Sequence, residues 1–250
     1  MILPLRMLLV GAVVFGALPS RSTHAADSEF KSLSPEAQTA EWAQKWWLPR
    51  HQEKLAGLAA AKGMIDLLWI GDSITHNWEN QGKPVWEKYY GNRKAFNLGF
   101  SGDRTEHVLW RFRNDTLSCI SPKLAIVMIG TNNTGHRKDP AVETAAGVEA
   151  IVQSLRWRLP DTKIMLLAIF PRGANKKDEL RMLNDQINKR IAKFADNKMV
   201  FFKDVSGVFL EKDGTLSPSV MPDLLHPGEH GYTLWADAIE PLVKQLMGEL

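Results

Sequence analysis

The stretch KLAIVMIGTNN, residues 123–133, decides the fold of this chain. After Lys123 it is apolar at every position up to Gly130, so both faces of the predicted strand are buried, as they are in parallel sheets. Polar residues follow the glycine at once. Shorter apolar runs have the same form elsewhere, and we predict strands over 65–70, 94–98, 123–129, 163–170 and 199–202.

Amphipathic helical patterns separate these strands. They cover 104–112, 141–158, 177–195 and 229–247. Ahead of the first strand, Ser34-Pro35-Glu36 has the form of a helix start and Gly63 that of a helix end, which predicts an N-terminal helical extension. Strands alternating with helices, joined by right-handed crossovers, predict a three-layer α/β sandwich around a five-stranded parallel sheet.

Polar residues that could take part in a reaction come directly after these strands or shortly before the last helix. Gly71-Asp72-Ser73, Gly99-Phe100-Ser101-Gly102 and Gly130-Thr131-Asn132 each follow a strand, and Asp223 and His226 precede the final helix. Ligands bind beyond the carboxyl ends of strands in such sheets. A serine needs an imidazole to remove its proton, the imidazole needs an acid to fix its tautomer, and an oxyanion needs preorganised donors. The pattern predicts acyl transfer.

In this order the four segments resemble the motif blocks of the SGNH (GDSL-type) hydrolases. His107-Val108-Leu109-Trp110-Arg111, Gly130-Thr131-Asn132-Asn133 and Phe170-Pro171-Arg172-Gly173 look like the intracellular platelet-activating-factor acetylhydrolases. The resemblance covers roughly 66–246. It implies a flavodoxin-like sheet and a carboxylic ester hydrolase, with Ser73 as nucleophile, His226 as base and Asp223 as its orienting acid. The implied oxyanion hole comprises the backbone N–H groups of Ser73 and Gly102 and the side chain of Asn132.

The N-terminus predicts export. Residues 1–26 contain Arg6, an apolar run of roughly 13 residues and small residues before a cleavage point, which is typical of a signal peptide. A membrane span needs roughly 20 apolar residues, so an anchor is disfavoured. We therefore expect a single domain over 27–250 with a periplasmic or secreted location. The mammalian acetylhydrolase subunits are cytosolic, so the resemblance does not transfer their lipid substrate.

Charge and cysteine content exclude some partners. The formal net charge of +3 falls by two when Arg6 and Arg21 leave with the signal, so nothing favours nucleic acid or an anionic membrane. Cys119 is the only cysteine, cannot form an internal disulfide, and is expected to be a small buried residue. The sequence signals no cofactor and leaves the oligomeric state open.

Other sites are weaker alternatives. His226-Pro-Gly-Glu-His230 spells an H-x-x-E-H zinc pattern, but Pro227 and Gly228 disfavour the regular helix that a metal site needs, so we predict no metal. The first strand lacks the later glycines of a dinucleotide turn. Trp42, Trp46 and Trp47 could stack on a sugar or pack on the domain, and Arg172 could contact substrate; the sequence leaves these roles open.

The sequence thus predicts an exported serine esterase that hydrolyses short acyl esters, with acetyl groups on carbohydrates as the expected substrate. Two alternatives remain: a lipid or phospholipid acyl hydrolase, and a catalytically silent carbohydrate-binding protein on the same fold.

Overall fold

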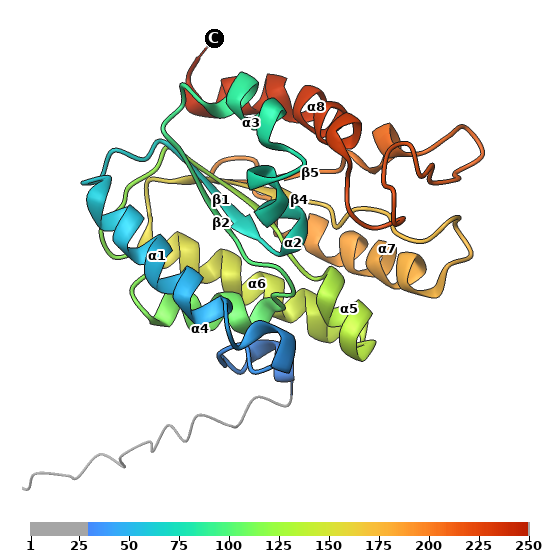
Figure 1. The fold of residues 1–250 in the computed structure, drawn as a ribbon, viewed down its shortest axis with the longest axis horizontal. Coiled ribbons are helices and arrows are strands. Elements are labelled where there is room, and N and C mark those ends of the chain that lie inside the picture. Colours follow the sequence, from blue (N-terminus) through green and yellow to red (C-terminus); the bar gives the residue numbers. More distant parts are fainter. Residues whose placement is uncertain (1–29, 250) are drawn as a thin grey trace, which may run out of the picture.

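A parallel sheet of five strands organises the molecule, and the computed structural model describes residues 30–249 (Figure 1). The strands are β1 (Leu67–Gly71), β2 (Ala95–Gly99), β3 (Leu124–Met128), β4 (Lys163–Leu167) and β5 (Val200–Lys203). They pair in the order β2-β1-β3-β4-β5, the flavodoxin-like order, and all neighbours are parallel. The predicted sheet is confirmed. Every residue of the central strand β3 is buried, which accounts for its uninterrupted apolar sequence.

Helices cover both faces of the sheet. In Figure 1, α3 and α8 lie on one side of it and α1, α4 and α6 on the other. The first face carries α3 (Lys83–Tyr90) and α8 (Glu229–Met247); the second carries α1 (Trp47–Ala60), α4 (Thr105–Arg113), α6 (Ala141–Arg158) and α7 (Glu179–Ile191). Two short helices follow strands directly, α2 (Ser73–His76) after β1 and α5 (Thr131–Arg137) close behind β3. Single 3-10 turns are η1 (Lys31–Leu33), η2 (Glu41–Ala43), η3 (Asn77–Glu79), η4 (Ala192–Phe194) and η5 (Ser206–Phe209).

The two faces of the sheet have different cores. The face under α4, α6 and α7 is packed with aliphatic side chains. On the face under α3 and α8, Trp69 of β1 packs against Trp78 and Trp235, with each pair of ring centroids 5.4 Å apart. Aromatic pairs of this geometry stabilise a core by about 0.5–1.5 kcal/mol beyond the area that they bury.

The segment before α1 departs from the prediction. Ser34-Pro35-Glu36 does not begin a helix: residues 35–40 have no regular structure, and the long helix begins only at Trp47. Residues 30–46, which we call the N-terminal strap, cross α4 and α6 instead (blue in Figure 1). The reason is tertiary, because the strap donates and accepts hydrogen bonds with those helices. Trp42 and Trp46 consequently do not share a helix face.

Two further expectations concern single features of the chain. The predicted signal peptide, residues 1–26, lies outside the described residues. Within residues 30–249 no helix combines the length and apolar character that crossing a bilayer requires. Cys119 is exposed, so the expectation of a buried cysteine was wrong; it lies in the turn region between α4 and β3, which faces solvent.

Candidate active site

Ser73 lies at the carboxyl end of β1, where the strand turns into α2. Gly71 ends the strand, and a Cβ at that position would lie 2.1 Å from Oγ1 of Thr75 and 2.5 Å from the carbonyl oxygen of Met128. The turn is therefore restricted to glycine by close packing. Asp72 caps α2 by accepting a hydrogen bond from the backbone N–H of Ile74 at 3.0 Å. Ser73 is the first helical residue, so its own N–H has no acceptor within the helix.

His226 and Asp223 approach Ser73 from the loop before α8. The Oγ of Ser73 lies 2.8 Å from Nε2 of His226, and Nδ1 of His226 lies 2.6 Å from Oδ2 of Asp223. An ionised carboxylate only accepts hydrogen bonds, so Nδ1 carries the proton and Nε2 accepts from the serine hydroxyl. The structure thus brings together the three residues that the sequence predicted, in the arrangement that activates a serine nucleophile.

The carboxylate of Asp223 also builds the turn that carries His226. Its Oδ1 accepts the backbone N–H groups of Leu225, at 3.0 Å, and His226, at 2.7 Å. Leu224 within the turn has a φ of +59°, a strained conformation for a branched side chain. One acid therefore fixes both the backbone and the ring of His226.

The charge state of Asp223 follows from these bonds. Partial burial alone would raise its pKa, but the hydrogen bonds from the ring and backbone of His226 outweigh it and hold the pKa below its ordinary value. The side chain of Asp223 is 55% exposed, so water reaches the outer side of the carboxylate. Asp223 is ionised at neutral pH.

Gly102 and Asn132 face the same cleft from two other strand ends. Gly102 has a φ of +75°, which favours glycine, and a Cβ there would lie 2.1 Å from the ring of Trp42. Asn132 uses one amide hydrogen to bond the carbonyl oxygen of Asp103 at 3.0 Å, and its second hydrogen remains available. Together with the backbone N–H of Ser73, this set is suited to stabilise a developing oxyanion.

The cleft around these residues has a volume of about 390 Å³. Six of its nine lining residues have polar side chains, and the residues that line it are Trp42, Ser73, Asn77, Ser101, Gly102, Asn132, His136, Leu225 and His226. Sequence reasoning missed Asn77, Ser101, His136 and Leu225. Each lies within a few positions of a predicted residue along the chain, so proximity in sequence was the one available signal.

Two carboxyl groups are completely buried behind the cleft. Burial raises the pKa of Asp72 to about 7 and that of Asp103 to about 6. Asp103 is nevertheless paired, because Arg111 and the indole N–H of Trp47 both donate to it. These groups lie beneath the reacting atoms and support the loops that carry them.

The open questions about tryptophans and Arg172 have different answers. Trp47 is buried in a small core with Phe100, so it packs the domain. Trp42 lines the cleft and is 53% exposed. Arg172 donates to the carbonyl oxygen and hydroxyl of Thr131, at 3.0 and 3.2 Å, and therefore braces the start of α5.

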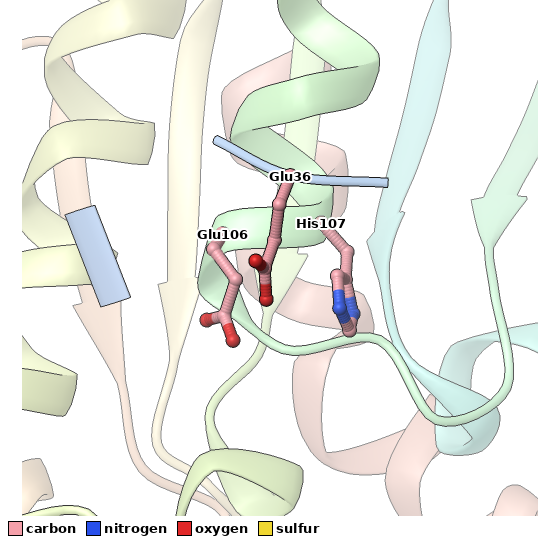
Figure 2. Close-up of side chains that lie close together, drawn as sticks. All are labelled: Glu36, Glu106 and His107. Carbon is pink, nitrogen blue, oxygen red and sulfur yellow. The ribbon is translucent and has the colours of Figure 1, made fainter. Parts of the chain in front are cut away.

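Histidine and carboxylate groups gather once in the described part of the chain in a form that could hold a metal. Figure 2 shows them: Glu36 of the strap lies beside Glu106 and His107 of α4. Arginines occupy the place of a cation there, since Arg104 and Arg137 donate to Glu106 at 2.5 and 2.6 Å, and Arg104 lies 3.1 Å from Nε2 of His107. The cluster is an ion-pair network that ties the strap to α4.

The H-x-x-E-H pattern does not lie on one helix. Helix α8 begins at Glu229, after both Pro227 and Gly228. His226 lies outside the helix, and both of its ring nitrogens are engaged, with Ser73 and Asp223. The pattern therefore lacks the helical spacing of a zinc site.

Comparison with known proteins defines the class. Residues 69–234 match the GDSL-like Lipase/Acylhydrolase family, and the chain belongs to it. Platelet-activating factor acetylhydrolase IB subunit alpha2 of Rattus norvegicus is 36% identical over 188 residues, which cover 74% of this chain and 78% of the relative. The human alpha1 subunit is 35% identical with the same coverage. The chain is a carboxylic ester hydrolase of this family.

Solved structures share the fold. A GDSL-like lipase from Bacteroides thetaiotaomicron superposes with a TM-score of 0.65 at 18% identity, over 78% of this chain and 97% of that one. An acetylxylan esterase from Geobacillus stearothermophilus gives a TM-score of 0.59 at 22% identity, over 74% and 94%. These likenesses confirm the predicted α/β architecture.

Proposed function

We propose that this protein is an exported serine esterase that removes short acyl groups, acetyl above all, from carbohydrate esters. One observation carries the proposal: Oγ of Ser73 lies 2.8 Å from Nε2 of His226, whose other nitrogen lies 2.6 Å from Asp223, and both Ser73 and His226 line the cleft. That arrangement has one common use in chemistry, the activation of a serine for acyl transfer.

The proposed reaction proceeds in two halves. Ser73 attacks the ester carbonyl as its proton passes to Nε2 of His226, and the oxyanion accepts hydrogen bonds from the N–H groups of Ser73 and Gly102 and the amide of Asn132. His226 then gives the proton to the departing alcohol. Water repeats the sequence on the acyl-enzyme, and the acid leaves. Asp223 holds the ring and stabilises its cation in both halves.

The composition of the cleft supports a short acyl group. Only Trp42 and Leu225 among its lining residues are large and apolar, so a long hydrocarbon chain would find little surface to bury. Two of the compared proteins are named for acetyl groups, the platelet-activating factor acetylhydrolase subunits and the acetylxylan esterase. A carbohydrate alcohol suits the polar rim of the cleft and the proposed export, which rests on the signal-like pattern of residues 1–26.

Two other functions are less well supported. A lipid acyl hydrolase needs an extended apolar surface beside the nucleophile, and Trp42 and Leu225 are the only large apolar residues among those that line the cleft. A silent binding protein needs no ordered nucleophile, yet each of the Ser73, His226 and Asp223 side chains is within hydrogen-bond distance of the next.

Hydrolysis of p-nitrophenyl esters from acetate to dodecanoate tests the activity, with the wild type beside Ser73→Ala and the exposed control Ser118→Ala. We expect the acetate to be hydrolysed fastest, Ser118→Ala to match the wild type, and Ser73→Ala to lose activity by a factor of about 10⁴ or more. Activity that survives in pure Ser73→Ala would exclude Ser73 as nucleophile. A maximum at long chains would favour the lipid hydrolase.

The predicted export is tested separately. Cell fractionation and N-terminal sequencing of the mature protein are expected to find a chain that begins near residue 27, outside the cytoplasm. A full-length cytoplasmic chain would contradict it.

A further inference from the structure

Trp42 lies against the backbone of the proposed oxyanion loop. Its ring fills the space where a side chain at Gly102 would stand, and the residue also lines the cleft. The side chain is 53% exposed, although burying a tryptophan is strongly favourable. A large flat apolar surface beside a nucleophile is a feature of ligand recognition.

The ring of Trp46 packs against Trp42 and is itself in contact with the ring of His76. Trp46 stacks on Trp42 with ring centroids 6.1 Å apart and planes inclined by 29°, and the indole N–H of Trp46 donates to the carbonyl oxygen of Trp42 at 3.1 Å. The ring of His76 lies 5.9 Å from that of Trp46. Trp42 therefore has a fixed orientation before any ligand arrives.

The strap that carries Trp42 is anchored at two points ahead of that residue, Ser32 and Gln38. Ser32 donates its hydroxyl to the carbonyl oxygen of Glu143 at 2.6 Å and accepts from Thr105 at 3.0 Å. The side-chain amide of Gln38 donates to the carbonyl oxygen of Gly102 at 3.3 Å. These bonds join the strap directly to the loop whose N–H group would hold the oxyanion. Preorganisation of this kind reduces the entropy lost on binding.

The strap also lies outside the residues that match the family model. The family match begins at residue 69, after the strap and α1. The reacting residues lie within the match, whereas the aromatic wall lies outside it. Trp42 is therefore separate in sequence from the catalytic residues that the family model covers.

We propose that Trp42 is a specificity-determining residue that stacks on the pyranose ring of the acylated sugar, on the alcohol side of the ester. This rests on the proposed function and names its substrate contact. The acyl group reaches inward to Ser73, and an acetyl group is too small to cover an indole. Trp42 is 53% exposed and lines the cleft, so its ring is accessible to the alcohol part of the ester, which must extend toward solvent. The apolar face of a pyranose fits a flat indole, while its hydroxyls suit the polar rim formed by Asn77, Ser101 and His136.

Binding without turnover provides the first test. Calorimetry with acetylated xylo-oligosaccharide is performed on Ser73→Ala and on Ser73→Ala combined with Trp42→Ala, Trp42→Phe or Trp157→Ala. We expect Trp42→Ala to weaken binding at least tenfold and Trp42→Phe to weaken it less, because a smaller ring remains. Trp157 is 78% exposed and does not line the cleft, so Trp157→Ala is expected to bind as the parent does.

Kinetics then separate the alcohol side from the acyl side. These measurements use enzyme in which Ser73 is intact. Trp42→Ala is expected to lower kcat/KM at least tenfold for the acetylated saccharide and under threefold for ethyl acetate, which has no ring to stack. Equal losses on both esters, or undiminished saccharide binding, would overturn the proposal. The proposal would also be overturned if Trp42→Ala gained activity on longer acyl chains while its saccharide affinity stayed unchanged. Trp42 would then limit the space for the acyl chain instead of binding the sugar. Loss of Ser73 dependence would instead refute the proposed function itself, so the two failures are distinguishable.

Discussion

Asp103 and Arg111 form an ion pair that is completely buried behind the cleft. Oδ2 of Asp103 accepts from Nε of Arg111 at 3.0 Å, and neither side chain is exposed. The guanidinium also lies over the ring of Phe100, 4.1 Å from its centroid. The carbonyl oxygen of the same Asp103 receives the hydrogen bond of Asn132. The pair thus supports the proposed oxyanion loop from within the core.

Removing Arg111 is expected to be severely destabilising. Arg111→Met leaves the Asp103 carboxylate buried without its cation, which typically costs about 3–5 kcal/mol. Urea denaturation at pH 8 measures this loss. The double variant Asp103→Asn with Arg111→Met removes the stranded charge and is expected to recover more than half of it. No recovery would mean that packing against Phe100, rather than charge, dominates.

Asn132 and Asn133 are adjacent in sequence and are predicted to act differently. Asn132→Ala removes a proposed oxyanion donor and is expected to lower kcat about 10²–10³-fold, with KM changed little. Asn133 is fully buried and bonds Thr105 and Asp139, at 3.1 Å in each case. Asn133→Ala is expected to cost about 1–3 kcal/mol of stability. Steady-state kinetics and urea unfolding of both variants test this division of roles. Full kcat in Asn132→Ala would contradict it.

Asp223→Asn is predicted to damage catalysis more than folding. The substituted amide still offers an oxygen to the backbone turn, but it no longer fixes the tautomer of His226, so kcat is expected to fall about 10²–10⁴-fold. Asp213 makes a similar turn, in which it accepts the N–H of Thr215 at 2.9 Å. It is far from Ser73 in sequence and is not among the residues that line the cleft. Asp213→Asn is the matched control and is expected to keep wild-type kcat. Equal effects in the two variants would argue against an orienting role for Asp223.

Asp72 is predicted to make stability depend on pH. Burial raises its pKa to about 7 in the folded protein from the ordinary 3.8. Between these values the folded state binds a proton that the unfolded state has lost, so the free energy of unfolding falls as pH rises. Asp72→Asn keeps the cap on Ile74 and abolishes this fall. At pH 8 we expect it to be more stable than the wild type by roughly 2–4 kcal/mol, and near pH 3.5 equally stable.

A control with the opposite sign accompanies that experiment. Three backbone N–H groups, of Lys198, Met199 and Val200, lower the pKa of the exposed Asp196 to about 2. Its stabilising effect is present above pH 4 and is lost as pH falls toward 2. Asp196→Asn is therefore expected to lose stability at neutral pH, where Asp72→Asn gains it. Parallel pH profiles for the two variants would refute the assignment for Asp72.

Much of this structure was predictable because the signals were local or were forced by the sheet. The strand over 123–129 is apolar on both faces, and the structure has β3 over Leu124–Met128. The helix predicted over 229–247 is α8 with the same bounds. The strand pattern predicted that the segments with Ser73, Gly102 and Asn132 lie together, because parallel strands deliver their carboxyl ends to one edge, and the family resemblance implied their roles.

The failures have two physical causes, tertiary contacts and weak local signals. Ser34-Pro35-Glu36 carries a helix-start pattern, but hydrogen bonds to α4 and α6 hold the strap in an extended path. The helices α3 and α5 were not predicted because α3 is short and α5 contains Asn132, Asn133 and Gly135, which are poor helix formers. The position of Trp42 beside Gly102 joins residues 60 apart in sequence, and no local pattern encodes that approach.

The attachment of the strap has an evolutionary consequence. It runs ahead of the first strand and is joined to the rest by side-chain and backbone hydrogen bonds at Ser32, Gln38 and Thr105. Mutations can therefore reshape one wall of the cleft while the chain from Ser73 to His226 stays untouched. Substrate preference can thus diverge through a short leading segment while the reacting side chains are retained, and the same segment is a target for the protein engineer.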